Sequence, residues 1–365
     1  MKPLSGLRIV EFDGLGPVTF LGMVLADLGA DVVRLTRADS AGAAVFTEVG
    51  GAILHRGRSA VPVDLKFEAD RARVLDLVSQ SDGLIEGFRP GVMERLGLGP
   101  EVCQARNPAL VFARVTGWGQ TGPLATSVGH DINYLALSGA LSTFGEADRP
   151  ARPPLNLVGD YAGGALMGAI GLLSGILQAR TTGKGTVIDV AMTDGVALMT
   201  ALFHALAARG LWTDQRDTNL LDGSTPFYRC YRCRDGGEVA VGALEPRFYA
   251  ALLAGLGLTP EDAPQYDRGR WPEIADRFAA IFATRDRDDW ASLFTSTEAC
   301  VTPVLGLSEA LSHPHNQARG TFDQRGAPAP APLFDGVRPG GETATAPTID
   351  LPGALQRWTG SAPAR

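Results

Sequence analysis

Residues 7–12, Leu-Arg-Ile-Val-Glu-Phe, open the part of the sequence that decides the fold. This apolar run predicts a buried strand, residues 17–28 predict a helix, and a second apolar run at 31–35 predicts another strand. A strand, a helix and a second strand in this order form a βαβ unit, which places the two strands parallel in one sheet. The predicted fold class is therefore α/β, with a large Rossmann-like domain built on a parallel sheet.

Gly14-Leu15-Gly16, in the first turn of this unit, invites comparison with the fingerprint of nicotinamide dinucleotide sites. Thr19 stands where the third glycine of that fingerprint belongs. The second strand ends in Leu35-Thr36-Arg37, without the acidic residue that would bind a ribose. A nicotinamide cofactor is therefore not expected, and Arg37 is suited instead to a phosphate group.

The bulk composition is that of a soluble protein of enzyme size. The 365 residues are 45% hydrophobic and 20% charged, which is enough for a large core and for two domains. A net charge of −7 argues against a nucleic acid or an anionic membrane as a partner. No apolar run reaches the ~18 residues that a membrane span needs, and the first residues do not read as a signal peptide. We therefore expect a cytoplasmic protein.

The four cysteines, Cys103, Cys230, Cys233 and Cys300, are too few and too unevenly spaced for a disulfide framework. Cys230 and Cys233 form a lone CxxC pair, without a second pair or neighbouring histidines. We therefore expect no metal site, and both thiols are expected to pack inside from a strand. His204, at an apolar position of a helix predicted over 194–210, is likewise expected to pack in a core.

The pattern along the chain predicts two domains. The large domain covers 1–210 and is completed by the C-terminal segment 320–365, which is rich in proline and alanine near its start and is expected to be extended. A polar, turn-rich linker at 211–224 leads into a smaller α+β domain at 225–306. A return linker at 307–319 follows.

Two proton-transfer groups stand in a glycine-rich stretch. His130 belongs to Gly-His-Asp-Ile-Asn-Tyr at 129–134, and Asp160 belongs to Asn-Leu-Val-Gly-Asp-Tyr-Ala-Gly-Gly at 156–164. The glycines allow tight turns and let a ligand approach the main chain closely. Taken alone, Asp160 fits equally well as the N-cap of a helix that begins near Tyr161, and His130 as a half-buried loop histidine. The sequence around the two residues decides between these interpretations.

These motifs, together with several others, resemble those of the family III CoA-transferase superfamily, and within it most closely the branch of 2-methylacyl-CoA racemases. The resemblance extends from residue 1 to about 335. The other matching motifs are PLSGLRIVE at 3–11, LADLGADVVR at 25–34, FRPGVMERLGLGP at 88–100, TGWGQTGP at 116–123 and VGALEPRFY at 241–249. The resemblance implies the fold of this family, in which two chains thread through each other as an intertwined homodimer.

The resemblance also implies an acyl-CoA substrate and no separate cofactor, because coenzyme A is part of the thioester. Taken singly, the basic residues Arg37, Lys66, Arg89 and Arg95 could be scattered surface charge. Together they suit the diphosphate and ribose phosphate of coenzyme A. The positions implied to bind substrate or CoA are Arg37, Val63, Asp64, Leu65, Lys66, Gly87, Phe88, Arg89, Arg95, Gly129, Ile132, Asn133 and Tyr134. Phe88 stands where related racemases tend to have a tyrosine, which leaves that position without a hydroxyl.

Inversion of a 2-methylacyl thioester requires removal of the α-proton from one face, its return to the other, and stabilisation of the enolate between the two steps. The resemblance implies that His130 and Asp160 serve the two faces. It also implies that Glu245 orients the histidine ring, with assistance from Asp131. The backbone N–H of Asp131, at a predicted helix N-terminus, is the candidate donor to the enolate oxygen. In the intertwined dimer Glu245 would reach the partner's His130.

Two other functions stay open. In the transferase branch an aspartate attacks the acyl-CoA and carries the acyl group as a mixed anhydride, and Asp160 would be its equivalent. His130 speaks against that function, as does Gly-Ala-Leu-Glu-Pro at 242–246, which replaces a run of glycines in the transferases. A non-catalytic acyl-CoA-binding protein would explain the arginines but not the acid–base pair. The acyl group stays open too, because methyl-branched fatty acids, sterol side chains and arylpropanoyl groups share the same α-carbon.

Overall fold

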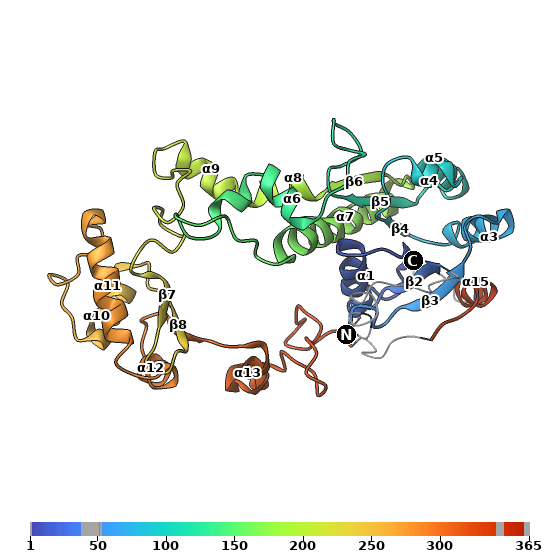
Figure 1. Cartoon of the computed structure of the whole chain (residues 1–365). Coiled ribbons are helices and arrows are strands. Elements are labelled where there is room, and N and C mark those ends of the chain that lie inside the picture. The colour runs from blue at the N-terminus through green and yellow to red at the C-terminus, as the bar shows by residue number, and fades with distance from the viewer. Residues whose placement is uncertain (1, 38–50, 52, 341–346, 361–365) are drawn as a thin grey trace. The chain divides into compact units, whose positions relative to one another are not determined.

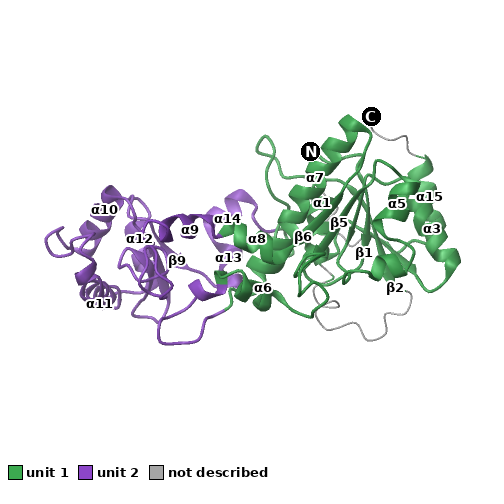
Figure 2. Ribbon diagram, turned by 90° about the horizontal axis from the view of Figure 1, so that it is seen from above, with its two compact units in different colours: residues 1–140, 153–199, 323–365 green, residues 141–152, 200–322 purple. Residues whose placement is uncertain are grey.

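The computed structural model of the chain describes residues 2–37, 51, 53–340 and 347–360. By its internal contacts the chain forms two compact units, which Figure 2 shows in different colours. Unit 1 comprises residues 1–140, 153–199 and 323–365, and unit 2 comprises residues 141–152 and 200–322. Each unit has its own sheet and its own core. The domain boundaries predicted from the sequence remain a prediction.

Unit 1 is built on a sheet of six parallel strands in the order β3-β2-β1-β4-β5-β6 (Figure 1). The strands are β1 (Arg8–Phe12), β2 (Asp31–Arg37), β3 (Ser59–Val63), β4 (Gly83–Glu86), β5 (Val111–Thr116) and β6 (Val187–Ala191). Every residue of β1, β4 and β5 is buried, as expected for central parallel strands that are covered on both faces. The predicted α/β class and parallel sheet are confirmed.

Helices cover both faces of this sheet. They are α1 (Pro17–Asp27), α3 (Glu68–Val78), α4 (Val92–Arg95), α5 (Pro100–Arg106), α6 (Asp131–Leu137), η2 (Leu157–Leu166), α7 (Met167–Thr182), α8 (Met192–Met199) and α15 (Leu351–Gly360). One apolar cluster lies between the sheet and the pair α1 and α7. A second cluster lies on the other face, beneath α3, α5 and α15. The sheet is therefore doubly wound.

The π-helix η2 runs directly into α7, so that residues 157–182 form one continuous helical stretch. By length and composition alone these 26 residues could cross a membrane, and half of their most apolar part is buried within the structure. The expectation that no apolar stretch is long enough for a span was therefore wrong. The composition has a physical reason in this fold, because Leu172 and Ile176 belong to the cluster between α7 and the sheet.

The C-terminal segment returns to unit 1 and adds a helix that the sequence did not predict. The N–H of Ile349 donates to the carbonyl of Ala60 in β3 (2.9 Å). In α15 the buried Trp358 donates its indole N–H to Asp31 (2.9 Å), and Arg357 pairs with the same carboxylate (2.6 Å). An extended tail was the wrong expectation for α15, where Leu351, Ala354 and Trp358 are buried at a helical spacing that the sequence analysis did not recognise.

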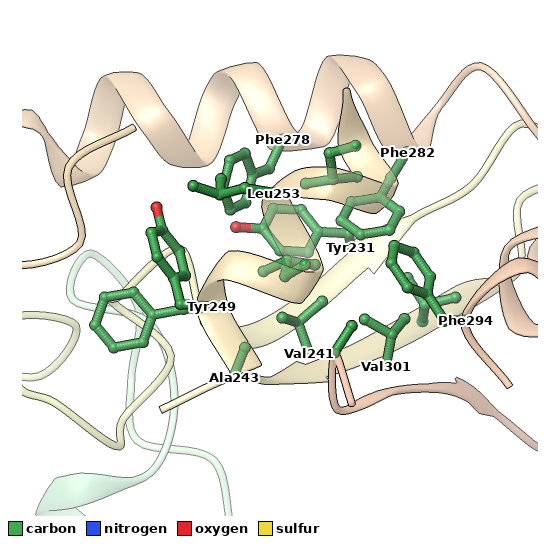
Figure 3. Close-up of a cluster of buried hydrophobic side chains, with 14 of the residues drawn as sticks. Tyr231, Val241, Ala243, Tyr249, Leu253, Phe278, Phe282, Phe294 and Val301 are labelled. Atoms are coloured by element: carbon green, nitrogen blue, oxygen red, sulfur yellow. The ribbon is translucent and has the colours of Figure 1, made fainter. Parts of the chain in front are cut away.

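Unit 2 is the smaller α+β part and is built on the antiparallel sheet β7-β8-β9. Its strands and α-helices are α9 (Ala201–Ala207), β7 (Tyr228–Arg232), β8 (Glu238–Gly242), α10 (Pro246–Leu256), α11 (Trp271–Phe282), α12 (Arg287–Phe294), β9 (Val301–Val304), α13 (Leu307–Ser312) and α14 (Pro314–Arg319). Figure 3 shows its aromatic core, in which the rings of Tyr231 and Phe282 stack at 5.0 Å. The Tyr231 hydroxyl donates to the carbonyl of Pro226 (2.6 Å), so the one polar atom of this ring is satisfied.

Two local predictions were wrong. The helix predicted over 194–210 is interrupted at Thr200, and His204 is exposed on α9, a helix that buries none of its residues. Cys233 is buried as expected, whereas Cys230 is exposed. Residues three apart on an extended chain point to opposite faces, so the two thiols of this pair do not share one environment.

Candidate active site

The carboxyl ends of the parallel strands carry most of the residues predicted to bind coenzyme A. Arg37 is the last residue of β2. The segment 63–66 begins with the last residue of β3, and the segment 87–89 directly follows β4. The strand order reverses between β1 and β4, and open α/β sheets bind ligands outside their carboxyl ends at such a point. The cationic side chains of this edge, Arg37, Lys66 and Arg89, are exposed, as is Arg95 at the end of α4. The structure thus brings the predicted cationic residues to one edge of unit 1.

The turn after β3 is held in shape by two residues of α3. The N–H of Asp64 donates to the Asp70 carboxylate (3.0 Å). The Arg71 guanidinium donates to the carbonyls of Leu65 (2.9 Å) and Lys66 (2.8 Å). Because these bonds engage the backbone, they fix the path of the segment and leave the ammonium of Lys66 exposed for a ligand.

The turn after β4 is held by Glu86, a residue to which the sequence reasoning assigned no role. Its fully buried carboxylate accepts the N–H of Phe88 (2.7 Å) and the Nε–H of Arg114 (2.9 Å). Arg114 also donates to both carboxylate oxygens of Glu94 (2.7 and 3.3 Å). Burial raises the pKa of Glu86 to about 7, although the Phe88 N–H and Arg114 act in the opposite direction. An acidic residue that closes the apolar run 83–86 is the sequence signal that could have revealed it.

His130 and Asp160 lie in unit 1 on two different elements. His130 is exposed directly before α6, and its backbone N–H donates to the Asn133 side chain (3.0 Å). Asp160 lies in the first turn of η2, and it is therefore not the N-cap of a helix that begins near Tyr161. Burial raises the pKa of the Asp160 carboxyl and the charge of Asp131 raises it further, whereas the Asn156 hydrogen bond and the His130 charge lower it. His130 directly precedes Asp131, whose carboxylate accepts the backbone N–H of Asp160 (2.7 Å), so the start of α6 lies against the first turn of η2.

Two neighbours of the Asp160 carboxylate have no counterpart in the sequence reasoning. The Asn156 amide donates to its Oδ2 (3.3 Å). A Cβ atom added to Gly16 would lie 2.8 Å from the same oxygen, so the carboxylate lies against the residue that precedes α1. The N-terminus of a helix favours negative charge, and α1 therefore offers Asp160 some electrostatic stabilisation. The four-residue spacing of Asn156 and Asp160 is a sequence signal that could have paired them.

Tyr134 lines the same site from α6. Its hydroxyl donates to the carbonyl of Gly129, and its ring meets that of Trp118 edge to face (4.8 Å between centroids). A Cβ atom at Gly117 would overlap the tyrosine ring, so the loop after β5 needs glycine at this position. Burial raises the pKa of Tyr134, and the charges of Asp160 and Asp131 raise it further. Through its hydroxyl the ring holds the backbone of Gly129, which directly precedes His130.

Glu245 belongs to unit 2, where it directly precedes α10. The Gln265 amide donates to the carbonyls of Ala243 (3.3 Å) and Leu244 (2.8 Å), which fixes the backbone that leads to Glu245. Its predicted contact with a histidine ring remains a prediction. In the described ranges no group of three or more His, Cys, Asp and Glu side chains is arranged to hold a metal ion.

With this geometry in view, the comparisons with known proteins place the chain in a family. Residues 4–348 match the model of CoA-transferase family III, and the chain belongs to this family. It is 44% identical over 336 residues to the alpha-methylacyl-CoA racemases of Mus musculus and of Homo sapiens, a match that covers 91% of this chain and 86% of each relative. The crystal structure of a CaiB/BaiF family protein from Brucella suis is similar, with a TM-score of 0.80 at 25% identity, and the match covers 97% of this chain and 98% of that one.

Proposed function

We propose that this chain is a racemase that interconverts (R)- and (S)-2-methylacyl-CoA thioesters by 1,1-proton transfer through an enolate. The observation that supports the proposal is that two proton carriers, His130 and Asp160, come from separate elements linked by Asp131, whose carboxylate accepts the backbone N–H of Asp160 (2.7 Å). The identity with the mouse and human racemases supports the same reaction over acyl transfer.

In the proposed mechanism His130 and Asp160 face opposite sides of the substrate α-carbon. One takes the α-proton as a base while the other, protonated, returns a proton to the opposite face, and the two roles exchange with the configuration of the substrate. Burial raises the pKa of Asp160 and so brings this carboxyl nearer to the pH at which it can both accept and donate a proton. The N–H of Asp131, at the start of α6, is the proposed donor to the enolate oxygen.

The CoA part of the substrate is proposed to bind along the carboxyl edge of the sheet. Arg37, Arg89 and Arg95 would meet phosphate oxygens with charge-assisted hydrogen bonds, and Lys66 would add a point charge. The two turns that carry Lys66 and Arg89 are held from within the protein, which lowers the cost of ordering them around a ligand. We propose no separate cofactor, because the thioester itself contains coenzyme A.

We further propose a cytoplasmic homodimer that acts on methyl-branched acyl groups of lipid metabolism. Apolar side chains along the η2–α7 stretch support an interface with a second copy. Leu166, Ile170 and Leu177 are 44%, 59% and 67% exposed, and their spacing places them on one helical face. In the proposed dimer Glu245 orients the ring of the partner's His130. Co-expressed His130→Ala and Glu245→Ala chains should then regain activity that neither chain has alone, and a fully active monomer would contradict the dimer.

The proposed reaction is tested by exchange of the α-proton in deuterated water, with each enantiomer of a 2-methylacyl-CoA as substrate. The wild-type protein should exchange the α-proton and racemise both enantiomers. His130→Ala should retain exchange, with retention of configuration, for one enantiomer, and Asp160→Asn should retain it for the opposite one. His204→Ala, which removes an exposed histidine of unit 2, is the matched control and should behave as wild type.

Two other outcomes would overturn the racemase proposal. A transferase would show no solvent exchange at the α-carbon and would form a hydroxylamine-sensitive acyl intermediate on Asp160. It would also transfer CoA from the acyl-CoA to an acceptor acid after loss of His130, and would release the first acyl group as its free acid. A protein that only binds acyl-CoA would show tight binding without exchange in the wild type.

A further inference from the structure

The carboxylate of Asp131 engages the helix that carries Asp160. Asp131 is the first residue of α6, and only 8% of it is exposed. Its Oδ1 accepts the backbone N–H of Asp160 at 2.7 Å, across 29 positions of sequence. The other oxygen of this carboxylate, Oδ2, is buried and has no hydrogen-bond partner among the described residues. Asp131 therefore binds a backbone donor in the first turn of η2 from outside that helix.

The Asp160 N–H needs a partner from outside its helix. The first N–H groups of any helix have no acceptor within it, and in η2 the N–H of Tyr161 bonds back to the carbonyl of Asn156 (3.3 Å). The side chain of Asn156, at the N-cap position, makes no capping bond and donates instead to the Asp160 carboxylate. The acceptor for the Asp160 N–H comes from Asp131, so α6 supplies a cap for η2.

Gly159 is what allows this carboxylate to approach so closely. A Cβ atom at Gly159 would overlap Oδ1 of Asp131 and would lie 2.7 Å from its Cγ. Gly159 itself is buried, so a displaced carboxylate has little room nearby. Close packing of the Asp131 carboxylate on Gly159 thus fixes α6 against the start of η2.

We propose that Asp131 is a positioning residue whose carboxylate sets the separation between His130 and Asp160. His130 is its neighbour in the chain, and its hydrogen bond ends on the backbone of Asp160 itself, so one side chain links the two proton carriers. This inference rests on the proposed racemase function. It also gives Asp131 a task distinct from orientation of the histidine ring, because Oδ1 is engaged by the Asp160 N–H.

The exchange assay, run with each enantiomer, tests this role. Asp131→Ala removes the hydrogen bond between α6 and η2 and lets η2 shift relative to α6. The Asp160 carboxylate is then misplaced relative to the substrate α-carbon. A misplacement of about 1 Å can cost about 100-fold in rate, and we expect a fall of that order in kcat for the enantiomer deprotonated by Asp160. Exchange of the other enantiomer should fall far less, because His130 keeps its place before α6. KM for the acyl-CoA should change little, since the cationic edge is untouched.

Three comparison variants complete the test. Asp131→Asn keeps an acceptor oxygen for the Asp160 N–H and should restore most of the exchange that Asp131→Ala loses. Gly159→Ala should reproduce the enantiomer-selective loss with the aspartate in place. Asp262→Ala is the matched control, because Asp262 also accepts a backbone N–H, that of Thr259 (2.9 Å), but in a turn of unit 2. It should leave exchange of both enantiomers unchanged.

The inference and the proposed function fail in different ways. A wild-type protein that exchanges neither enantiomer contradicts the racemase function. If the wild-type protein exchanges both enantiomers, the Asp131→Ala variant tests the positioning role alone. That role is overturned if the variant loses exchange of both enantiomers equally, or keeps exchange of both. The same conclusion would follow if Asp131→Asn lost the Asp160-dependent exchange as fully as Asp131→Ala does.

Discussion

The buried carboxyl of Glu86 should make the stability of unit 1 depend on pH near neutrality. Burial raises its pKa from 4.5 to about 7 in the folded chain. A carboxyl whose pKa is higher in the folded state stabilises the fold at low pH, and this stabilisation is lost as the pH rises through the folded-state value. For a change from 4.5 to about 7, the loss between pH 5 and pH 8 amounts to about 2.5 kcal/mol, since one pH unit corresponds to about 1.4 kcal/mol.

The substitution that isolates this effect is Glu86→Gln, which keeps an acceptor for the Phe88 N–H but cannot ionise. Urea unfolding of the wild type and the variant at pH 5, 6.5 and 8 gives the difference in unfolding free energy at each pH. Other titrating groups cancel in this difference, so the wild type should lose about 2.5 kcal/mol relative to the variant over this range. Glu94→Gln is the matched control, because Glu94 binds the same Arg114 while its side chain is 46% exposed. Parallel stability curves for wild type and Glu86→Gln would refute the reasoning.

Three further outcomes are expected. Arg37→Ala should raise KM for an acyl-CoA by about 10- to 100-fold, as for the loss of a charge-assisted bond, and should matter much less for an acyl-pantetheine; equal losses would contradict a phosphate contact. Gly117→Ala should lower both Tm and kcat, with a stability cost of about 1–3 kcal/mol, because the added methyl group displaces the ring of Tyr134; an unchanged Tm would contradict this packing. Phe278→Ala, at a site with no exposed surface, should cost about 3–5 kcal/mol in the unfolding of unit 2, and a cost below 1 kcal/mol would contradict the core described.

Much of the fold follows from local sequence patterns. Apolar runs at 7–12 and 31–35 predicted strands of a parallel sheet, and the structure has β1 and β2 there. Such predictions succeed because a buried parallel strand needs apolar residues on both faces, and that requirement is visible within a few residues. The family, too, was recognisable from short motifs, and the match over residues 4–348 bears this out.

The failures have two causes. In α15 the apolar residues Leu351, Ala354 and Trp358 do recur at helical spacing, and the prediction of an extended tail overlooked that signal. The start of η2 was misplaced because the N–H of Asp160 is capped by Asp131, from a helix 29 residues earlier, and not by a neighbour in the chain. A local pattern carries no record of such a partner.

The candidate site shows the same division. The sequence by itself determined which residues can transfer protons, His130 and Asp160, because residue type decides that chemistry and the glycines around them mark a place open to a ligand. Only the tertiary structure decided how they are held, with Asn156 and Gly16 against the Asp160 carboxylate and Asp131 on its backbone. These contacts arise when η2, α1 and α6 pack together, and the direction of a hydrogen bond or the depth of burial exists only after that packing is complete.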